Sequence, residues 1–468
     1  MPSFGPDELQ AWTGGKWSGR PPAAVGGFSV DSRSLRPGQA FVALRTERRD
    51  GHDYIAAAQA AGAAAAVVTR PVDGAGLAQL VVPDPLAAMQ AIAGAHRRAF
   101  TGTVFGITGS AGKTSTKEIL AALLGGEAGG VLSTEANLNN QIGVALTLCR
   151  IDPARHRFAV VEAGISAPGE MRTLAAIIQP DIAIVTLVAA AHLADLGTLE
   201  AVASEKALLC AGMREGGLSV FPRSCEAYAA FRSIPEGSRL TVERVSALGD
   251  RAQPRGRAAY RVSQSASATT VEVAFGPAPA ISIAARRVTD GMAGNIAMAA
   301  CAAARAGVQR RELGRRLSGW GAAPLRGEWR TCEGRRVYLD CYNANPASMA
   351  DALAVFRATA PEAEPRLFVI GSMEELGPSA ASFHVELGRT LGMRHGDMLV
   401  AIGSHAAQVR EGAVASGVDP GSIEVAQGVD EVAPRLAAFH GSIFVKGSRR
   451  YQLERAFARA GQPEEAHA

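Results

Sequence analysis

The pattern of apolar and polar residues predicts short buried strands that alternate with amphipathic helices along the chain. Short apolar runs at Val104–Thr108, Phe158–Glu162 and Ile182–Val188 have the length of buried strands. The segment Thr114–Leu124, by contrast, repeats its apolar positions at helical spacing. Strands and helices that alternate in this way predict an α/β fold built on mostly parallel, doubly wound sheets.

This alternation divides the chain into three units, which we place at residues 1–98, 99–323 and 324–468. The first is a small α/β unit, and the third is again α/β. Within the second unit, residues 240–290 favour β-hairpins, because apolar and polar residues alternate with a period of two at Thr269–Phe275. The alanine-rich stretch that follows, Asn295–Gly307, predicts a long buried helix.

Composition narrows the possible functions. No apolar run approaches the roughly 18 residues of a membrane span, and the first ten residues carry Asp7 and Glu8 without a basic segment, so we expect neither a membrane helix nor a secretion signal. The six scattered cysteines form no CxxC pair, which favours a reducing, cytoplasmic setting over zinc or disulfides. The net charge of +4 comes without a basic stripe interleaved with aromatic residues, so we expect no nucleic-acid partner.

The clearest chemical signal is a glycine loop, Gly106–Ser115, between a predicted strand and a predicted helix. Its glycines let backbone N–H groups converge on phosphate oxygens, Lys113 can reach the outer phosphates, and the Thr114 hydroxyl can bind Mg²⁺. The strict pattern G-x-x-x-x-G-K-[ST] is not met, because its first glycine falls at Ile107. The alternative is a structural turn with a surface lysine. A nucleotide loop alone fits a motor, a kinase or a ligase.

Three further residues are candidates with an open alternative each. Glu162 ends an apolar strand, where it could bind Mg²⁺ or be an ordinary strand-end acid. His192 could bind metal or phosphate, although a lone histidine is more often a packing residue. Lys206 lies in a predicted helix and could be a solvated lysine. If it carried CO₂ as a carbamate, it would instead offer an anionic oxygen ligand. Only five of the 48 basic residues are lysines. A lysine in such a chain is a candidate for a role that needs a primary amine or a compact point charge, which arginine cannot supply.

Several motifs together resemble the Mur ligase superfamily over nearly the whole chain, and most closely its branch that adds D-alanyl-D-alanine in peptidoglycan synthesis. In the first unit, Asp31-Ser32-Arg33 and Asp50-Gly51-His52-Asp53 resemble a uridine-nucleotide-binding domain. The other matching segments are Thr108–Glu118, Thr134–Gly143, Asp340–Met349, Met373–Gly377 followed by His384, and Lys446–Arg449.

The resemblance implies three domains: a small N-terminal one that binds UDP-MurNAc-tripeptide, a central one that binds ATP, and a C-terminal Rossmann-like one that closes over both. It also implies a reaction. ATP phosphorylates the terminal carboxylate of the tripeptide, the amine of D-Ala-D-Ala attacks the acyl phosphate, and ADP and phosphate leave. Family members are usually monomers, so we expect one here.

The resemblance further implies a set of site residues. For catalysis these are Lys113, Glu162, His192 and Lys206, with Lys206 carbamylated. For two Mg²⁺ ions they are Thr114, Glu162, His192 and Lys206. For ATP they are Gly109, Ser110, Ala111, Gly112, Lys113, Thr114, Ser115, Asn295, Asp340 and Asn343. For the other substrates they are Asp31, Ser32, Arg33, Thr134, Asn137, Asn140, Asn345, His384 and Lys446.

The chain also departs from the family pattern. Leu187 and Ala189-Ala190 replace an asparagine and a Gly-Pro pair, Gly291-Met292 stands where the family residues approach adenine, and Glu328 and Ser372 are changed as well. The changed positions are ones that the family uses to recognise adenine and to close the domains. The groups that take part in phosphate transfer are unchanged. The changes keep two alternatives open: a related ligase with another amine or acyl substrate, and a catalytically impaired binding homologue.

Overall fold

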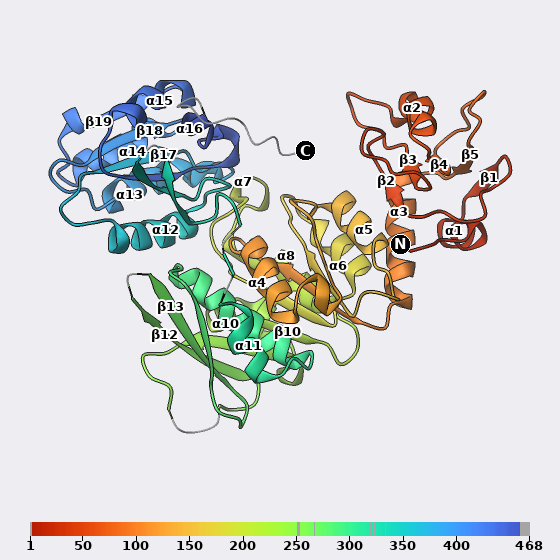
Figure 1. The fold of residues 1–468 in the computed structure, drawn as a ribbon, viewed down its shortest axis with the longest axis horizontal. Coiled ribbons are helices and arrows are strands. Elements are labelled where there is room, and N and C mark those ends of the chain that lie inside the picture. Colours follow the sequence, from red (N-terminus) through yellow and green to blue (C-terminus); the bar gives the residue numbers. More distant parts are fainter. Residues whose placement is uncertain are drawn as a thin grey trace.

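Three separate β-sheets follow one another along the chain in the computed structural model, which describes residues 2–249, 253–265, 267–318, 320–321, 323–332 and 334–458 (Figure 1). The predicted α/β fold with three domains is confirmed. Met1 and residues 459–468, the outer ends of the first and third predicted units, lie outside the described ranges. In Figure 1 the first and third domains lie on opposite sides of the view, with the central domain between and below them.

The N-terminal domain contains a five-stranded sheet in the order β1-β5-β4-β3-β2. Its strands are parallel except β1, which pairs with β5 in the antiparallel sense. The strands are β1 (Lys16–Ser18), β2 (Phe28–Ser29), β3 (Ala40–Val42), β4 (Ala65–Val68) and β5 (Ala78–Val81), and the helices are α1 (Pro6–Thr13), α2 (Ile55–Ala60) and α3 (Pro85–Ala99).

Helix α3 joins this domain to the central one. Its N-terminus is capped by Asp84, whose carboxylate accepts the N–H groups of Leu86 and Ala87. Along its length α3 packs against α1 and against α5 (Gln141–Cys149) and α6 (Glu170–Ile178) of the central domain (Figure 1). The first domain is therefore attached through a packed helix as well as through the chain.

The central domain is built on a nine-stranded sheet in the order β14-β13-β12-β11-β10-β9-β6-β8-β7. Its strands are β6 (Thr103–Thr108), β7 (Val131–Ser133), β8 (Phe158–Glu162), β9 (Ile182–Val185), β10 (Leu218–Pro222), β11 (Arg239–Arg244), β12 (Arg257–Gln264), β13 (Ala268–Phe275) and β14 (Ile281–Arg286). Besides α5 and α6, its helices are α4 (Lys113–Leu124), α7 (Leu193–Leu196), α8 (Leu199–Ala211), α9 (Ala229–Arg232), α10 (Asp290–Arg305) and α11 (Arg310–Arg316).

The predicted hairpin region of this domain is only partly antiparallel. Strands β12, β13 and β14 form the expected meander, but β11 pairs in parallel with both β10 and β12. Strand β11 is difficult to recognise in the sequence, because its ends are charged and only its middle, Thr241-Val242, is buried. Helix α10 begins five residues before the predicted Asn295, since Thr289 caps it by accepting the N–H of Met292 at 3.0 Å.

The C-terminal domain has a six-stranded sheet in the order β15-β16-β20-β17-β18-β19, parallel except for β15. Its strands are β15 (Glu328–Cys332), β16 (Arg335–Leu339), β17 (Arg366–Gly371), β18 (Met398–Ile402), β19 (Ile423–Ala426) and β20 (Ser442–Lys446). Its helices are α12 (Pro346–Thr359), α13 (Ala380–Thr390), α14 (Ala406–Ala415), α15 (Val429–Ala438) and α16 (Arg455–Ala458). Within the described ranges, none of the helices combines the length and the apolar character that a membrane span requires.

The buried Arg97 of α3 generates a stability prediction. Its guanidinium donates to the carbonyls of Ile178, Phe100 and Gln179 and to the carboxylate of Asp181, which in turn accepts the N–H of Val104. We expect Arg97→Met to lower the free energy of unfolding by about 3 kcal/mol, because it removes the cation that pairs with the Asp181 carboxylate and the donor to the buried carbonyls. Urea unfolding followed by circular dichroism measures the change. The exposed neighbour Arg98→Met is the control, and equal unfolding midpoints for the two variants would contradict the prediction.

Candidate active site

The glycine loop connects the buried strand β6 to helix α4, as the sequence predicts. Gly109 and Gly112 have φ angles of 151° and 79°, which side chains rarely tolerate. A Cβ atom at Gly109 would lie 1.9 Å from the hydroxyl of Thr186. Lys113 folds back over the loop and donates to the Gly109 carbonyl at 2.8 Å. Burial lowers the pKa of this lysine, and the nearby Glu162 opposes that effect. The loop therefore has the shape of a phosphate cradle.

The residues beside the loop fit a bound Mg²⁺ ion. The Thr114 hydroxyl donates to Oε1 of Glu162 at 3.2 Å, and the Asn139 side chain donates to the same oxygen at 2.8 Å. The other oxygen of the buried Glu162, Oε2, has no hydrogen-bond partner among the described residues. A buried carboxylate oxygen without a partner is costly unless a cation or a proton satisfies it. A threonine hydroxyl next to a free carboxylate oxygen is a donor set that Mg²⁺ prefers.

Asn139 is a site residue that the sequence prediction missed. Its neighbours Asn137 and Asn140 were predicted instead, but Asn137 is exposed, and Asn140 caps α5 by accepting the N–H of Gly143 at 2.9 Å. The predicted Thr134 lies behind Glu162, where its hydroxyl accepts the backbone N–H of Glu162 at 3.0 Å. The repeated asparagines of the motif were a signal for this region, but they did not indicate which of them turns inward.

His192 lies at a contact between two domains. Its Nδ1 is 2.5 Å from a carboxylate oxygen of Glu375, which comes from the loop after β17 in the C-terminal domain. The N–H of Ala194 donates to the Glu375 carbonyl at 3.1 Å. The hydrogen bond to His192 lowers the pKa of Glu375. The sequence prediction contained the motif around Glu375 but did not assign this residue to the site.

Lys206 lies inside helix α8 with only 1% of its surface exposed. The side chain makes no hydrogen bond or ion pair within the part of the chain that the structure describes. Burial lowers the pKa of Lys206 well below its ordinary value, and the nearby charge of Lys113 lowers it further. No group of three or more His, Cys, Asp or Glu side chains among the described residues is placed to hold a metal ion. The second Mg²⁺ site implied by the family resemblance stays a prediction.

The C-terminal domain brings its own polar groups to the loop. Lys446 donates to the Asp340 carboxylate at 2.6 Å and to the Asn343 carbonyl at 3.2 Å. Burial raises the pKa of Asp340, and the Lys446 ammonium opposes that rise. The Asn345 side chain donates to the Ser110 carbonyl of the loop at 3.0 Å.

Arg326 adds a second link between the C-terminal domain and the loop. Its guanidinium donates to the Thr114 hydroxyl at 3.0 Å and stacks 4.0 Å above the centre of the Tyr342 ring. The sequence motifs assigned no role to this arginine.

These groups surround one cavity of about 1140 Å³ between the central and C-terminal domains. Nine of the ten residues predicted for ATP line it, the exception being Gly109. Glu162, Asn345 and Lys446 line it as well, but His192 and Lys206 do not. Part of the apolar surface in the cavity comes from Met292 and from three residues that no motif indicated, Tyr260, Trp320 and Trp329. They belong to segments far apart in the sequence, so only the fold brings them together.

The predicted substrate residues of the N-terminal domain do not line this cavity. Arg33 donates to Asp31 at 3.0 Å and lowers the pKa of that carboxyl to about 2. His384, from the C-terminal domain, is buried, and its Nε2 accepts the N–H of Met373 at 2.8 Å. The predicted substrate residues therefore lie partly in the N-terminal domain and partly around His384 in the C-terminal domain. Their roles in binding substrate stay predictions.

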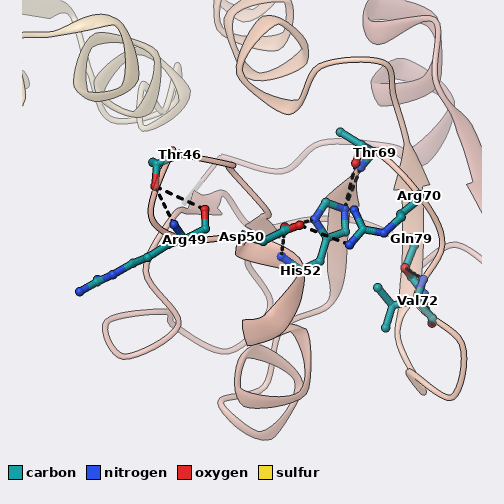
Figure 2. Close-up of polar contacts among 8 residues, drawn as sticks. All are labelled: Thr46, Arg49, Asp50, His52, Thr69, Arg70, Val72 and Gln79. Carbon is teal, nitrogen blue, oxygen red and sulfur yellow. Dashed lines mark hydrogen bonds and ion pairs between the residues drawn. The ribbon is translucent and has the colours of Figure 1, made fainter.

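A polar network also organises the N-terminal domain (Figure 2). The N–H of Thr69 donates to Nε2 of the buried His52 at 3.1 Å, so Nδ1 carries the ring proton and donates to Asp50 at 2.6 Å. Arg70 donates to the other oxygen of Asp50 at 3.3 Å. The pKa of Asp50 is lowered, chiefly by hydrogen bonds from His52. The motif Asp50–Asp53 is therefore ordered by contacts within its own domain.

The segment that departs from the family pattern after β9 still supports the loop. The Leu187 carbonyl accepts the N–H of Ser110 at 2.8 Å, and the Ala189 carbonyl accepts the Ser110 hydroxyl at 2.8 Å. Both contacts use backbone atoms, so they survive a change of side chain. The changed Glu328 accepts the N–H of Leu325, and Ser372 bridges the Ile402 carbonyl and the His405 N–H.

Comparisons with known proteins agree with this architecture. Three family models match consecutive parts of the chain: the Mur ligase family catalytic domain at residues 25–97, the Mur ligase middle domain at 107–303, and the Mur ligase glutamate ligase domain at 325–449. The UDP-N-acetylmuramoyl-tripeptide–D-alanyl-D-alanine ligase of Escherichia coli is 34% identical, over 82% of this chain and 83% of the relative. The Bacillus subtilis ligase of the same name is 30% identical over 83% and 82%.

Solved structures give the same result. A crystal structure of MurF from Acinetobacter baumannii superposes with a TM-score of 0.85 at 26% identity, covering 98% of this chain and 99% of the other. MurF ligase from Thermotoga maritima in complex with ADP has a TM-score of 0.76 at 26% identity and covers 92% and 96%. The matched domains, the full-length relatives and the cavity around a phosphate loop lead to one conclusion: this chain belongs to the Mur ligase family.

Proposed function

We propose that this protein is an ATP-dependent ligase that joins D-alanyl-D-alanine to UDP-MurNAc-tripeptide, the final cytoplasmic step of peptidoglycan precursor synthesis. The observation that carries the proposal is the single cavity in which Lys113, Thr114 and Glu162 of one domain face Asp340 and Lys446 of another. The names of the relatives that match most of the chain supply the substrates. Residues 1–98 would bind the UDP-sugar, 99–323 would bind ATP, and 324–468 would complete the site.

The phosphate loop and Lys113 would hold the β- and γ-phosphates of ATP. Backbone N–H groups at the start of α4 and the Lys113 ammonium present positive charge to the phosphates as negative charge moves toward the leaving ADP. Thr114 and Glu162 would hold Mg²⁺, which neutralises phosphate charge when it is bound. Asn295, Asp340 and Asn343 would contact the nucleotide from the other walls of the cavity.

The chemistry then takes two steps. A carboxylate oxygen of the tripeptide attacks the γ-phosphorus of ATP, and ADP leaves with the electrons of the broken P–O bond. The amine of D-alanyl-D-alanine attacks the acyl carbon of the acyl phosphate, loses a proton, and inorganic phosphate leaves. An acyl phosphate is easily lost to water, so the enclosure of the site between two domains protects the intermediate.

We further infer that Lys206 reacts with CO₂ to form a carbamate. The amine is buried and has no partner among the described residues, and its burial favours the uncharged form, which is the nucleophile that attacks CO₂. The carbamate, formed with loss of a proton from the amine, would be an anion near Lys113 and would provide an oxygen ligand for the second Mg²⁺ ion. Glu162 and His192 would be the other protein ligands of that ion.

The two alternatives differ in how well the site supports them. An impaired binding homologue is favoured by the changed residues Gly291, Met292 and Glu328. The backbone contacts of residues 187 and 189 argue against it, because they hold the loop despite the changes. A related ligase with another amine or acyl substrate keeps the same phosphate chemistry, and a substrate assay separates it from the leading proposal.

The assay combines the protein with ATP, Mg²⁺, UDP-MurNAc-tripeptide and D-alanyl-D-alanine, and measures phosphate release and product mass. We expect product with this amine, and Lys113→Met should lower kcat by about a thousandfold because the cationic donor is lost from the transition state. The exposed Lys16→Met is the matched control and should keep wild-type kcat. Turnover only with a different amine would support the related ligase, and no turnover with any amine would support the impaired homologue.

The metal assignment predicts a specific change in Mg²⁺ dependence. Glu162→Gln should raise the Mg²⁺ concentration for half-maximal rate by at least about tenfold, since a neutral amide is a weaker ligand than a carboxylate. Initial rates across a Mg²⁺ titration at saturating ATP measure this concentration. Glu127→Gln changes an exposed acid outside the site and serves as the control. An unchanged Mg²⁺ requirement in Glu162→Gln would exclude this residue as a ligand.

The carbamate proposal predicts chemical rescue. Lys206→Ala should lose activity, because the anionic ligand is missing, and added acetate or formate should restore part of it by entering the space left by the side chain. Rates with increasing carboxylate concentration test this, with chloride at equal ionic strength as the control. Full activity in Lys206→Ala without any addition would show that no carbamate is needed.

A further inference from the structure

One wall of the nucleotide cavity is made by helices from two different domains. Helix α10 belongs to the central domain and helix α12 to the C-terminal domain. Asp351 of α12 places its carboxylate over the first turn of α10, and both of its oxygens accept the backbone N–H of Gly291, at 3.1 and 3.2 Å. Carboxylates are favourable at this position because the first N–H groups of a helix have no partner within it.

Gly291 is suited to this contact by its lack of a side chain. A Cβ atom at residue 291 would lie 2.6 Å from Oδ2 of Asp351 and 3.3 Å from its carboxyl carbon. Atoms this close overlap, so the Asp351 carboxylate would have to leave its place over the N–H of residue 291. In most helices alanine is more favourable than glycine by about 1 kcal/mol. The position of the neighbouring carboxylate therefore accounts for a glycine in the first turn of α10.

The same two helices also contact the phosphate loop. Asn295, one turn after Gly291 on α10, packs so closely on the loop that a Cβ atom at Gly112 would lie 2.5 Å from its side-chain nitrogen. At the start of α12, Asn345 donates to the Ser110 carbonyl at 3.0 Å. The spacing between α10 and α12 therefore sets the spacing between two groups that hold the loop.

We propose that Asp351 is a positioning residue for nucleotide binding, which acts by holding α12 against α10 through the N–H of Gly291. Gly291-Met292 stands where the family residues approach adenine. In this chain, Gly291 instead makes a contact between two domains. The expected effect on the KM for ATP rests on the proposed ligase function. The expected effect on ADP affinity does not rest on it, because binding can be measured without turnover.

A double-mutant cycle tests the contact. The wild type, Gly291→Ala, Asp351→Ala and the double variant are titrated with ADP and Mg²⁺ in an isothermal calorimeter. Each single variant should weaken ADP binding by about tenfold, one by losing a hydrogen bond to a charged group and the other by overlap with it. In the Asp351→Ala background, Gly291→Ala should change the Kd by less than about twofold, because the overlapping atoms are gone.

Kinetics separate a positioning role from a general loss of stability. In Asp351→Ala the KM for ATP should rise by about tenfold, while the KM for D-alanyl-D-alanine stays within about twofold. Asp351→Asn retains an oxygen that can accept the Gly291 N–H, and it should bind ADP within about threefold of the wild type. Glu386→Ala, on the exposed face of α13, is the control for removing an acid from the same domain.

Two outcomes would overturn the proposal. One is wild-type ADP affinity in Asp351→Ala. The other is an equal effect of Gly291→Ala with and without Asp351, which would mean that the glycine is needed for another reason. Binding stoichiometry near one in each titration establishes that the variants are folded. If the wild type binds ADP but forms no product, the proposed ligase function fails while the cycle still decides the role of Asp351.

Discussion

A phosphate loop binds anions only while its backbone keeps one shape, and the rest of this site depends on how that shape is held. Within the loop, the Lys113 ammonium donates to the Gly109 carbonyl. Further support comes from the segment after β9, where the carbonyls of Leu187 and Ala189 accept hydrogen bonds from Ser110, and Thr186 donates to the Ala111 carbonyl. Because Leu187 and Ala189 take part through their backbone atoms, the family pattern around residues 187–190 can change while the loop stays intact.

The order of strands in the central sheet explains why these segments meet. Strand β6 lies between β8 and β9, all parallel, so the segments that follow the three strands leave the sheet at the same edge. The loop follows β6, Glu162 ends β8, and Thr186 follows β9. The buried charge of Glu162 is thereby placed next to Lys113, and each charge offsets the cost of burying the other.

The central domain alone leaves this site open on one side. The C-terminal domain closes it with a small number of polar contacts: Asn345 to the loop carbonyl, Arg326 to Thr114, Glu375 to His192 and Asp351 to Gly291. Polar contacts of this kind can form and break as substrates enter and products leave, which a large apolar interface would resist. The chemistry gains from this arrangement, because charges act more strongly on one another where water is excluded.

The sequence by itself determined the fold class, the phosphate loop and the family, because these follow from local patterns: buried strands are apolar, helices repeat every 3.6 residues, and a glycine-rich turn between them has few other uses. Through motifs it also indicated the phosphate-loop side of the cavity and part of the wall from the C-terminal domain. It did not indicate that Asn139 rather than Asn137 faces Glu162, that Glu375 meets His192, or that Asp351 explains Gly291. Each of these depends on which side chain points inward and on how two domains approach, and only the tertiary structure decides that, since residues far apart in the chain carry no local record of their contact.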